Sequence, residues 1–167
     1  MPSKRRNTAV FPGSFDPITI GHWDIVMRAL KMFDHIYVGI GRNINKKCLF
    51  PLEVRQQLVR KTFEGIPNVS VHLYDGLTVD FCREVGAQFI IRGIRSLFDF
   101  DYEKTLAHIN MELSNGEIET VFLFAKPEYS HVSSTMIRDI ITNKGKCSQF
   151  LPPPIQDLDL ISINLST

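Results

Sequence analysis

Residues 11–33, FPGSFDPITIGHWDIVMRALKMF, decide the fold, because they contain the change from a β-strand to a helix. The apolar, β-prone segment 8–12 leads into them. From residue 22 onward, apolar side chains recur at helical spacing: Ile25, Val26, Ala29, Leu30 and Phe33. A helix N-terminus at Gly21-His22 offers free N–H groups and a partial positive charge to an anion, and Gly21 lets a phosphate approach the backbone. The stretch therefore predicts a strand, a phosphate-binding turn and a helix.

The same alternation continues along the chain. Further strands are expected over residues 35–41, 69–74, 88–92 and 120–125, and further helices over residues 51–65, 78–86, 99–116 and 133–145. Thr78 is expected to cap the second of these helices. Tyr102, Leu106, Ile109 and Leu113 are spaced for one face of the third. Five strands separated by helices predict an α/β fold: a Rossmann-like, doubly wound, five-stranded parallel sheet with helices on both faces.

Length and composition are those of a single-domain globular protein. The 167 residues are expected to form one domain, 1–167, with a flexible N-terminus over 1–7 and a C-terminal extension over 155–167 that shows no clear period. A net charge of +1 provides no general field for nucleic acid or a membrane, so neither is expected as a partner. The three cysteines lack metal or disulfide spacing, and no apolar run approaches the ~20 residues of a membrane span. These features predict a cytoplasmic protein without a metal site of its own.

Residues with phosphate-binding chemistry follow the end of every predicted strand. They are Ser14, Phe15 and His22 after the first strand, Lys46 after the second, Thr78 after the third, Arg92, Gly93 and Arg95 after the fourth, and Tyr129 to Thr135 after the fifth. In a doubly wound sheet, ligands bind outside the carboxyl ends of the strands, so these residues are expected to meet. Arg92 and Arg95 can contact phosphate oxygens in a bidentate way, while Lys46 supplies a mobile point charge. The pattern predicts a site that holds two phosphate groups and neutralises charge on the one being attacked.

Each of these groups, taken alone, also fits a structural role. Gly21-His22 fits a tight turn with a surface histidine, residues 92–95 fit a solvated loop, and residues 133–135 fit a helix cap. Their occurrence in order, all at strand ends, favours a binding site. The sequence has no GxxxxGK[ST] loop, no GxGxxG after the first strand and no GxSxG turn. P-loop, dinucleotide-binding and α/β-hydrolase sites are therefore disfavoured.

Two short motifs connect these residues to a known superfamily. TIGH at 19–22 and VSSTMIR at 132–138 resemble the TxGH/HxGH and ISSTxIR signatures of the nucleotidyltransferases. The blocks PGSFDPITIGH, NKK, IIRGIRSLFDFDYEKTLAHIN and SSTMIRD resemble, in order and spacing, those of the bacterial phosphopantetheine adenylyltransferase family. The resemblance covers about residues 8–153. Thr19 in the first motif position favours this family over the HxGH branches.

The resemblance implies a reaction and its partners. ATP and 4'-phosphopantetheine would give dephospho-coenzyme A and pyrophosphate, the penultimate step of coenzyme A synthesis. The acceptor phosphate would attack the α-phosphorus of ATP in line, without a covalent enzyme intermediate, so the protein would act by positioning and by stabilising charge. Mg2+ would accompany the triphosphate without a dedicated protein cage. The chain would assemble as a homo-oligomer, typically a hexamer.

The same resemblance implies roles for individual residues. The catalytic residues would be His22, Lys46 and Arg95. Phosphopantetheine would be bound by Ser14, Lys46, Thr78 and Arg92. ATP would be bound by Ser14, Phe15, His22, Gly93, Ile94, Arg95, Glu103, Tyr129, Ser130, His131, Val132, Ser133, Ser134 and Thr135. Among these residues, His22 would contact ATP and stabilise the transition state.

Two other functions stay open at this point. A related transferase would use the same site on another phosphorylated acceptor, such as nicotinate mononucleotide, although Thr19 and the RGIRSLFDFDYE block disfavour it. A non-catalytic protein would keep the fold and bind a nucleotide without turnover. Such a protein should have lost His22, Lys46 or Arg92, and all three are present.

Overall fold

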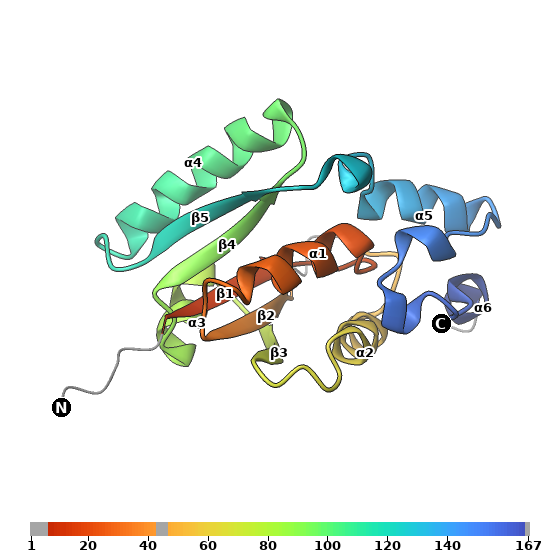
Figure 1. The fold of residues 1–167 in the computed structure, drawn as a ribbon, viewed down its shortest axis with the longest axis horizontal. Coiled ribbons are helices and arrows are strands. Elements are labelled where there is room, and N and C mark those ends of the chain that lie inside the picture. The colour runs from red at the N-terminus through yellow and green to blue at the C-terminus, as the bar shows by residue number, and fades with distance from the viewer. Residues whose placement is uncertain (1–6, 43–46, 166–167) are drawn as a thin grey trace.

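One parallel β-sheet organises the computed structural model, which describes residues 7–42 and 47–165. Its five strands, counted over those residues, are β1 (Thr8–Gly13), β2 (His35–Gly41), β3 (Val69–Tyr74), β4 (Phe89–Ile94) and β5 (Glu119–Phe124). Their order is β3-β2-β1-β4-β5, and every neighbouring pair is parallel. The predicted five-stranded, doubly wound α/β sheet is confirmed (Figure 1).

Helices cover both faces of this sheet, as predicted. They are α1 (Ile20–Ala29), α2 (Leu52–Thr62), α3 (Thr78–Val85), α4 (Leu97–Leu113), α5 (Ser134–Thr142) and α6 (Leu160–Leu165), with short 3-10 turns η1 (Pro127–Tyr129), η2 (Ser148–Phe150) and η3 (Pro153–Ile155). On one face lie α1, α2 and the C-terminal segments, and on the other lie α3 and α4. The chain runs past the end of β5 into α5, so that α5 and α6 lie beyond the carboxyl ends of the strands (Figure 1).

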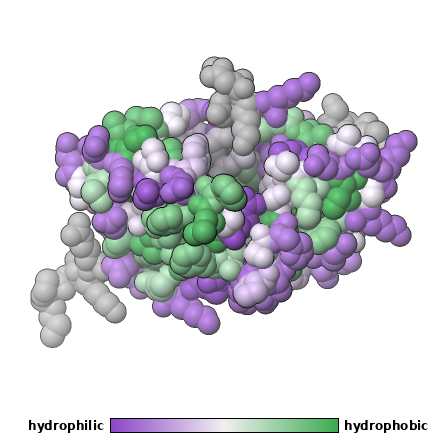
Figure 2. All heavy atoms as spheres, turned by 90° about the horizontal axis from the view of Figure 1, so that it is seen from above, coloured by the Kyte–Doolittle hydropathy of each residue, from purple (hydrophilic) through white to green (hydrophobic). Residues whose placement is uncertain are grey.

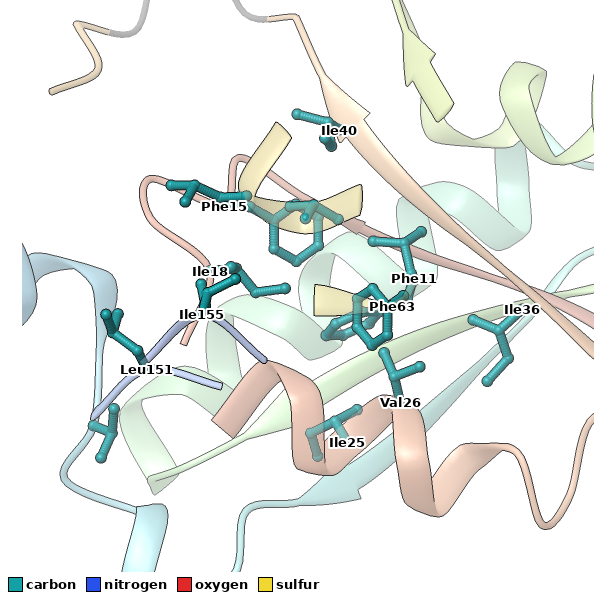
Figure 3. Packing of buried hydrophobic residues seen from close by; sticks show 14 of the residues in the cluster. Phe11, Phe15, Ile18, Ile25, Val26, Ile36, Ile40, Phe63, Leu151 and Ile155 are labelled. Carbon is teal, nitrogen blue, oxygen red and sulfur yellow. The ribbon is translucent and has the colours of Figure 1, made fainter. Parts of the chain in front are cut away.

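Two apolar cores follow from the alternation of side chains along the strands. Along β1, Ala9 and Phe11 face the larger core, whereas Val10 faces the smaller one. The larger core packs β1, β2, α1 and α2 against Leu151 and Ile155 near the C-terminus (Figure 3). Ile155 and Leu160 of the C-terminal extension, whose structure the sequence did not indicate, are therefore packed into the core.

The structure corrects the start of two helices. Leu77, not Thr78, occupies the N-cap of α3, and the Thr78 hydroxyl lies 3.1 Å from the hydroxyl of Tyr74 at the end of β3. That contact holds the Thr78 side chain away from a capping position. Helix α4 begins two residues before its predicted start, because Ser96 caps it by accepting a hydrogen bond from the backbone N–H of Asp99.

The predicted apolar face of α4 belongs to neither core. Within the described chain no α4 residue is buried, and Tyr102 is exposed. Leu106, Ile109 and Leu113 line a cavity beside the site instead. The spacing predicted a shared helix face correctly, but spacing alone gives no information on what covers that face.

The two ends of the chain were predicted to differ from the rest. The segment 1–7 lies outside the described residues except for Asn7, whose N–H donates to Asp34 Oδ2 at 2.9 Å.

The assignment of 1–167 to one domain stays a prediction. Over the part of the chain that the structure covers, no helix has the length and apolar character needed to cross a membrane.

Candidate active site

A cleft of about 610 Å³ opens at the carboxyl ends of the strands. It lies between the neighbouring strands β1 and β4. From β1 the chain continues to β2 on one side of this pair, and from β4 it continues to β5 on the other side. This is the switch point at which doubly wound sheets bind their ligands. The ends of β1 and β4, the start of α1, helix α4 and the start of α5 all contribute to its lining.

The turn after β1 places Phe15 beneath His22. Phe15 has a φ of 46°, in the left-handed region that residues other than glycine rarely adopt. Its buried ring meets the His22 ring edge-on, with 5.2 Å between the ring centroids. Gly13 makes room for that ring, since a Cβ at this position would lie 2.9 Å from Phe15 Cζ. An apolar floor thus holds the imidazole at the edge of the cleft.

His22 is held in one tautomer by the residue that caps its helix. Thr19 Oγ1 accepts a hydrogen bond from the His22 backbone N–H at 3.2 Å, and the Thr19 N–H donates to His22 Nδ1 at 3.0 Å. This is a capping box with histidine in place of the usual Glu or Gln. Because Nδ1 accepts, the neutral ring carries its proton on Nε2, which is left to donate to a ligand.

Burial keeps this histidine uncharged. Desolvation lowers the pKa of His22 to about 4, and the positive charges of Arg95 and Arg92 lower it in the same direction. At neutral pH the imidazole is therefore a neutral hydrogen-bond donor. The positive charge of the cleft comes from the arginines instead.

Both arginines are aimed by acidic residues of α4. Arg92 donates to the two carboxylate oxygens of Glu103, each at 2.6 Å, and to the Pro12 carbonyl at 3.1 Å. Arg95 donates through Nε to Asp99 at 3.1 Å, and through Nη1 to the carbonyl of Val132, the first residue of the second motif, at 3.3 Å. These contacts hold the two guanidinium groups in place, which lowers the entropy that they lose when they bind a phosphate.

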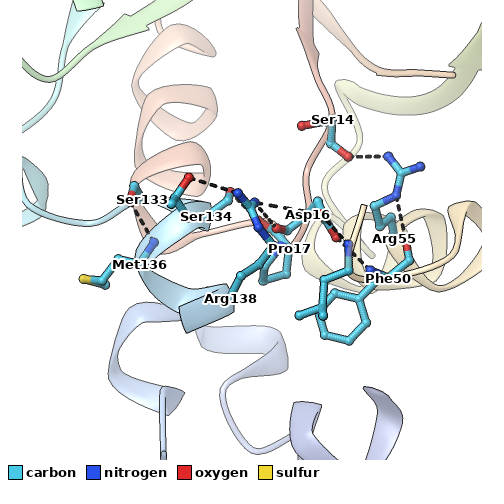
Figure 4. Close-up of polar contacts among 11 residues, drawn as sticks. Ser14, Asp16, Pro17, Phe50, Arg55, Ser133, Ser134, Met136 and Arg138 are labelled. Atoms are coloured by element: carbon cyan, nitrogen blue, oxygen red, sulfur yellow. Dashed lines mark hydrogen bonds and ion pairs between the residues drawn. The ribbon is translucent and has the colours of Figure 1, made fainter. Parts of the chain in front are cut away.

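The second motif is joined to the turn at residues 16–17, which leads into the first motif (Figure 4). Ser133 caps α5 by accepting a hydrogen bond from a backbone N–H three residues on, at 3.1 Å. Ser134 donates its hydroxyl proton to the Pro17 carbonyl at 2.8 Å, and Arg138 donates to the Asp16 carbonyl at 2.8 Å. The N-terminus of α5, with its free N–H groups, is thereby brought to the cleft that α1 also lines.

Two buried charged side chains connect the turn before the first motif to the segment before α2 (Figure 4). The Asp16 carboxylate accepts hydrogen bonds from the N–H groups of Leu49 and Phe50 at 2.8 and 2.9 Å. Arg55 donates to the Phe50 carbonyl at 3.1 Å and to the Ser14 carbonyl at 2.6 Å. Backbone groups thus satisfy both buried charges. Asp16 and Arg55, to which the sequence assigned no role, shape the turn of the motif.

A second cavity, of about 230 Å³, adjoins the cleft, and Thr78, Arg92 and Glu103 line both. Its walls are largely apolar: Leu77, Leu106, Ala107, Ile109 and Leu113. Asn110 and Thr120 are polar residues in the same walls. Among the described residues, nothing forms a hydrogen bond with the buried Thr120 hydroxyl. Because this oxygen is covered, a ligand in the cavity would reach it only after the Thr120 side chain rotates.

Most of the predicted site residues meet in the cleft. Its lining includes Ser14, Phe15, His22, Thr78, Arg92, Gly93, Arg95, Glu103, Tyr129, Val132, Ser133, Ser134 and Thr135. Three predicted residues do not line it within the described chain. Ile94 is buried in β4, the Ser130 hydroxyl donates to the Pro127 carbonyl, and the exposed His131 ring contacts Phe150. Lys46 lies outside the described residues, and the roles of all four stay predictions.

The cleft also contains residues that the sequence prediction did not include. Tyr74, Tyr102, Leu106 and Arg138 line it. Tyr74 is the last residue of β3, so the rule that placed the other residues at strand ends would have found it. Arg138 closes the second motif. Tyr102 and Leu106 gave no comparable signal, because their helical spacing fits a packing face equally well.

A search of solved structures found the same fold in a nucleotide-handling protein. A bifunctional NMN adenylyltransferase/ADP ribose pyrophosphatase from Francisella tularensis gives a TM-score of 0.70 over 96% of this chain at 16% sequence identity. A second structure of that protein, complexed with AMP and a manganese ion, gives 0.67 at 15% identity. This chain spans about half of each, 49% and 48%. The likeness shows the fold alone.

Comparisons of sequence are more specific. Residues 10–140 match the family model described as cytidylyltransferase-like. A phosphopantetheine adenylyltransferase from Bacteroides thetaiotaomicron is 49% identical over 86% of this chain and 94% of its own length. Another, from Flavobacterium psychrophilum, is 47% identical over 89% of this chain and 97% of its own length. With its two motifs joined at the switch point of the sheet and this degree of identity, the chain belongs to the phosphopantetheine adenylyltransferase family, within the cytidylyltransferase-like proteins.

Proposed function

We propose that this protein transfers the adenylyl group of ATP to 4'-phosphopantetheine, giving dephospho-coenzyme A and pyrophosphate, the penultimate step of coenzyme A biosynthesis. The observation that carries the proposal is the neutral imidazole of His22, which shares one cleft with Arg92 and Arg95 at the switch point of the sheet. The names of the relatives support it, since proteins 44% to 49% identical over most of the chain are phosphopantetheine adenylyltransferases.

The chemistry is a direct displacement at phosphorus. An oxygen of the acceptor phosphate attacks the α-phosphorus of ATP, the bond from that phosphorus to the oxygen bridging to the β-phosphate breaks, and pyrophosphate leaves with the bonding electrons. No side-chain nucleophile takes part, so the protein supplies position and charge stabilisation. His22 Nε2–H donates a hydrogen bond to a non-bridging oxygen of the reacting phosphate, and Arg95 neutralises charge beside it.

We assign the nucleotide to the part of the cleft between α1 and α5. Free N–H groups at both helix N-termini suit its phosphates. Gly21 faces Tyr129 there, because a Cβ on Gly21 would lie 4.0 Å from Tyr129 Cβ. Phe15 contributes through the turn that supports His22, while Ser133 and its neighbours contribute through the start of α5.

We assign phosphopantetheine to the second cavity and to its junction with the cleft. Arg92 and Thr78 line both cavities and are in place for the acceptor phosphate; Lys46 is assigned to the same phosphate from its sequence motif. The pantetheine arm is largely aliphatic and carries two amide groups. Apolar walls with Asn110 and the unpaired hydroxyl of Thr120 match that arm. Nicotinate mononucleotide has no comparable arm, so this cavity favours phosphopantetheine.

Magnesium enters this scheme with the substrate. Glu103, which lines the cleft, and Asp99, earlier on α4, are both paired with arginines. In the described part of the chain, no three His, Cys, Asp or Glu side chains gather into a metal-binding group. We therefore assign Mg2+ to the triphosphate of the incoming ATP, because this ion is usually held by phosphate oxygens and water with few protein ligands.

We also propose that the protein acts as a homo-oligomer in the cytoplasm. Phe98, Tyr102 and Phe124 are 92%, 66% and 69% exposed in the single chain, and Figure 2 shows hydrophobic side chains gathered on the face that carries α4. Exposed apolar patches of this kind mark contact surfaces. The family resemblance indicates a hexamer. Light scattering after gel filtration measures the assembly, and a monomer at micromolar concentration would contradict it.

The first test measures pyrophosphate release from ATP and Mg2+, with 4'-phosphopantetheine or nicotinate mononucleotide as the acceptor. Release only with phosphopantetheine supports the proposal. Release only with nicotinate mononucleotide overturns the substrate but keeps the chemistry. Release with neither, from folded protein that binds ATP, favours the non-catalytic alternative.

His22→Ala separates an enzyme from a nucleotide-binding protein. We expect ATP binding to be retained and turnover to fall about 10²–10³-fold, as when one transition-state donor is removed. His108→Ala, at an exposed position of α4, is the matched control and should leave turnover unchanged. Unchanged turnover in His22→Ala would remove this residue from the mechanism.

A further inference from the structure

The carboxylate of Asp24 connects helix α1 to the segment that follows β5. Asp24 lies two residues after His22, and its side chain is 6% exposed. Asp24 Oδ2 accepts a hydrogen bond from Arg28 Nε at 2.9 Å, and Asp24 Oδ1 pairs with Lys126 Nζ at 3.0 Å. Lys126 immediately precedes η1, which contains Tyr129. The ion pair therefore joins the helix that carries His22 to the turn that carries Tyr129.

Lys126 also contacts one wall of the nucleotide cleft. Lys126 Nζ lies 5.9 Å from the centroid of the Tyr129 ring, within the range of a cation–π contact. Tyr129 lines the cleft opposite Gly21, the residue before His22. Lys126 is absent from the described lining of the cleft. Its contacts with the site are those to Asp24 and to the Tyr129 ring.

Because Arg28 also pairs with Asp24, the Lys126 contact can be removed without disrupting the fold. When Lys126 is removed, Arg28 stays beside Asp24, so the buried carboxylate keeps a positive partner. Arg28 Nη2 also donates to the Phe124 carbonyl at 2.6 Å, which holds the end of β5 against α1 independently of Lys126. Loss of the Lys126 charge should therefore release the turn around Tyr129 while the sheet stays intact.

We propose that Lys126 is a positioning residue for the nucleotide: by bridging the Asp24 carboxylate and the Tyr129 ring, it fixes Tyr129 relative to His22. The expected effect on turnover rests on the proposed adenylyl transfer. The expected effect on ATP binding does not, because binding is measured without turnover. The hydrogen bond to Asp24, together with the Asp24 charge, raises the pKa of Lys126, so its ammonium stays charged through the neutral range.

Lys126→Met tests this role, because methionine keeps much of the apolar stem and removes the charge. We expect the KM for ATP to rise about fivefold, the size of effect that one partly exposed ion pair can produce. The kcat and the KM for 4'-phosphopantetheine should stay within about twofold of their original values. The dissociation constant of ATP, measured without acceptor, should rise by the same factor as the KM. Lys126→Arg keeps a cation that can pair with Asp24 and lie on Tyr129, so it should restore most of the affinity.

Lys104 provides a matched control. Lys104 Nζ pairs with Asp101 at 3.5 Å and lies 5.9 Å from the centroid of the Phe100 ring, and Lys104 is absent from the described lining of both cavities. Lys104→Met should leave the KM for ATP unchanged. Equal rises in the two variants, an unchanged ATP affinity in Lys126→Met, or no recovery in Lys126→Arg would each overturn the role. If the original protein shows no adenylyl transfer but Lys126→Met still weakens ATP binding, only the proposed function fails.

Asp24→Asn tests the bridge itself. In that background, Lys126→Met should raise the KM for ATP by less than about twofold, because the ion pair is already broken and the two changes are not additive. A full additional fivefold rise would show that Lys126 acts without Asp24, and would contradict the bridge.

Discussion

Arg138 Nη1 donates a 2.8 Å hydrogen bond to the carbonyl of Asp16, so the last residue of the second motif contacts the turn that leads into the first. Arg138 Nη2 donates to Thr135 Oγ1 at 3.0 Å, and Nη1 lies 3.8 Å from Asp16 Oδ2. A planar guanidinium group reaches a carbonyl, a hydroxyl and a carboxylate together, which an ammonium group on a flexible stem does less well. The arginine of this motif therefore has a structural role in joining α5 to the turn before α1.

Replacing Arg138 by methionine should lower both stability and turnover. Hydrogen bonds that involve a charged group contribute about 1.5–3 kcal/mol, and part of that is recovered when water reaches this partly exposed position. We expect the free energy of unfolding, measured with urea, to fall by about 1–2 kcal/mol, and kcat/KM to fall as α5 loses its contact with the first motif. Arg60→Met, at an exposed position of α2, should change stability by less than about 0.5 kcal/mol. Equal losses in the two variants would argue against a special role for Arg138.

Gly13, at the end of β1, and Gly21, in the first motif, should respond differently to alanine. A Cβ at Gly13 would lie 2.9 Å from Cζ of the buried Phe15 ring, so Gly13→Ala should destabilise the protein by about 1–3 kcal/mol. A Cβ at Gly21 would lie 3.5 Å from Thr19 Oγ1, an ordinary contact. Alanine is also favoured over glycine in helices by up to about 1 kcal/mol. Gly21→Ala should therefore keep or raise stability in thermal denaturation, yet raise the KM for ATP because its methyl group enters the cleft. The reverse order of stabilities would contradict the packing described here.

The architecture was predictable because its signals are local. The strands His35–Gly41 and Val69–Tyr74 have the bounds that their runs of β-prone residues predicted, and parallel strands bring their carboxyl ends to one edge. That rule placed predicted residues from four separate strand ends in one cleft, while Lys46, predicted at the fifth, lies outside the described residues. The left-handed Gly86 at the end of α3 likewise follows from glycine after a helical pattern.

The contacts that hold the site together carry no local signal. Thr78 was expected to cap α3, but the nearby Tyr74 hydroxyl, placed by the end of β3, takes its side chain instead. Asp24 and Lys126 look like ordinary surface charges in the sequence, and only the fold, which places the segment after β5 beside α1, brings them together. Pairs of this kind depend on tertiary structure, so composition and periodicity could not predict them.

Thr120→Val should separate stability from acceptor binding in the second cavity. The buried Thr120 hydroxyl has no hydrogen-bond partner among the described residues, so an apolar side chain of the same shape should leave stability unchanged or raise it. If an amide of the pantetheine arm uses that hydroxyl, the KM for 4'-phosphopantetheine should rise about three- to tenfold, while the KM for ATP stays constant. Steady-state kinetics with each substrate varied in turn measures both. An unchanged acceptor KM would move the arm away from this wall.

The lowered pKa of His22 should be measurable in two ways: in the NMR titration of its ring and in the pH dependence of the free energy of unfolding. The ordinary pKa of histidine, 6.5, falls to about 4 for His22 in the folded chain because the ring is desolvated. Between these two values the unfolded chain binds a proton that the folded chain does not. The contribution of His22 to stability therefore falls as the pH drops from 6.5 towards 4, and it is constant above 6.5. Replacing His22 by glutamine should remove that part of the slope, which urea denaturation at several pH values measures. In NMR spectra the His22 ring should titrate near pH 4 in the folded protein and near 6.5 in urea. Because His22 stays neutral above that range, kcat should show no His22 inflection between pH 6 and 8. A midpoint near 6.5 in the folded protein would contradict the role of His22 as a neutral donor.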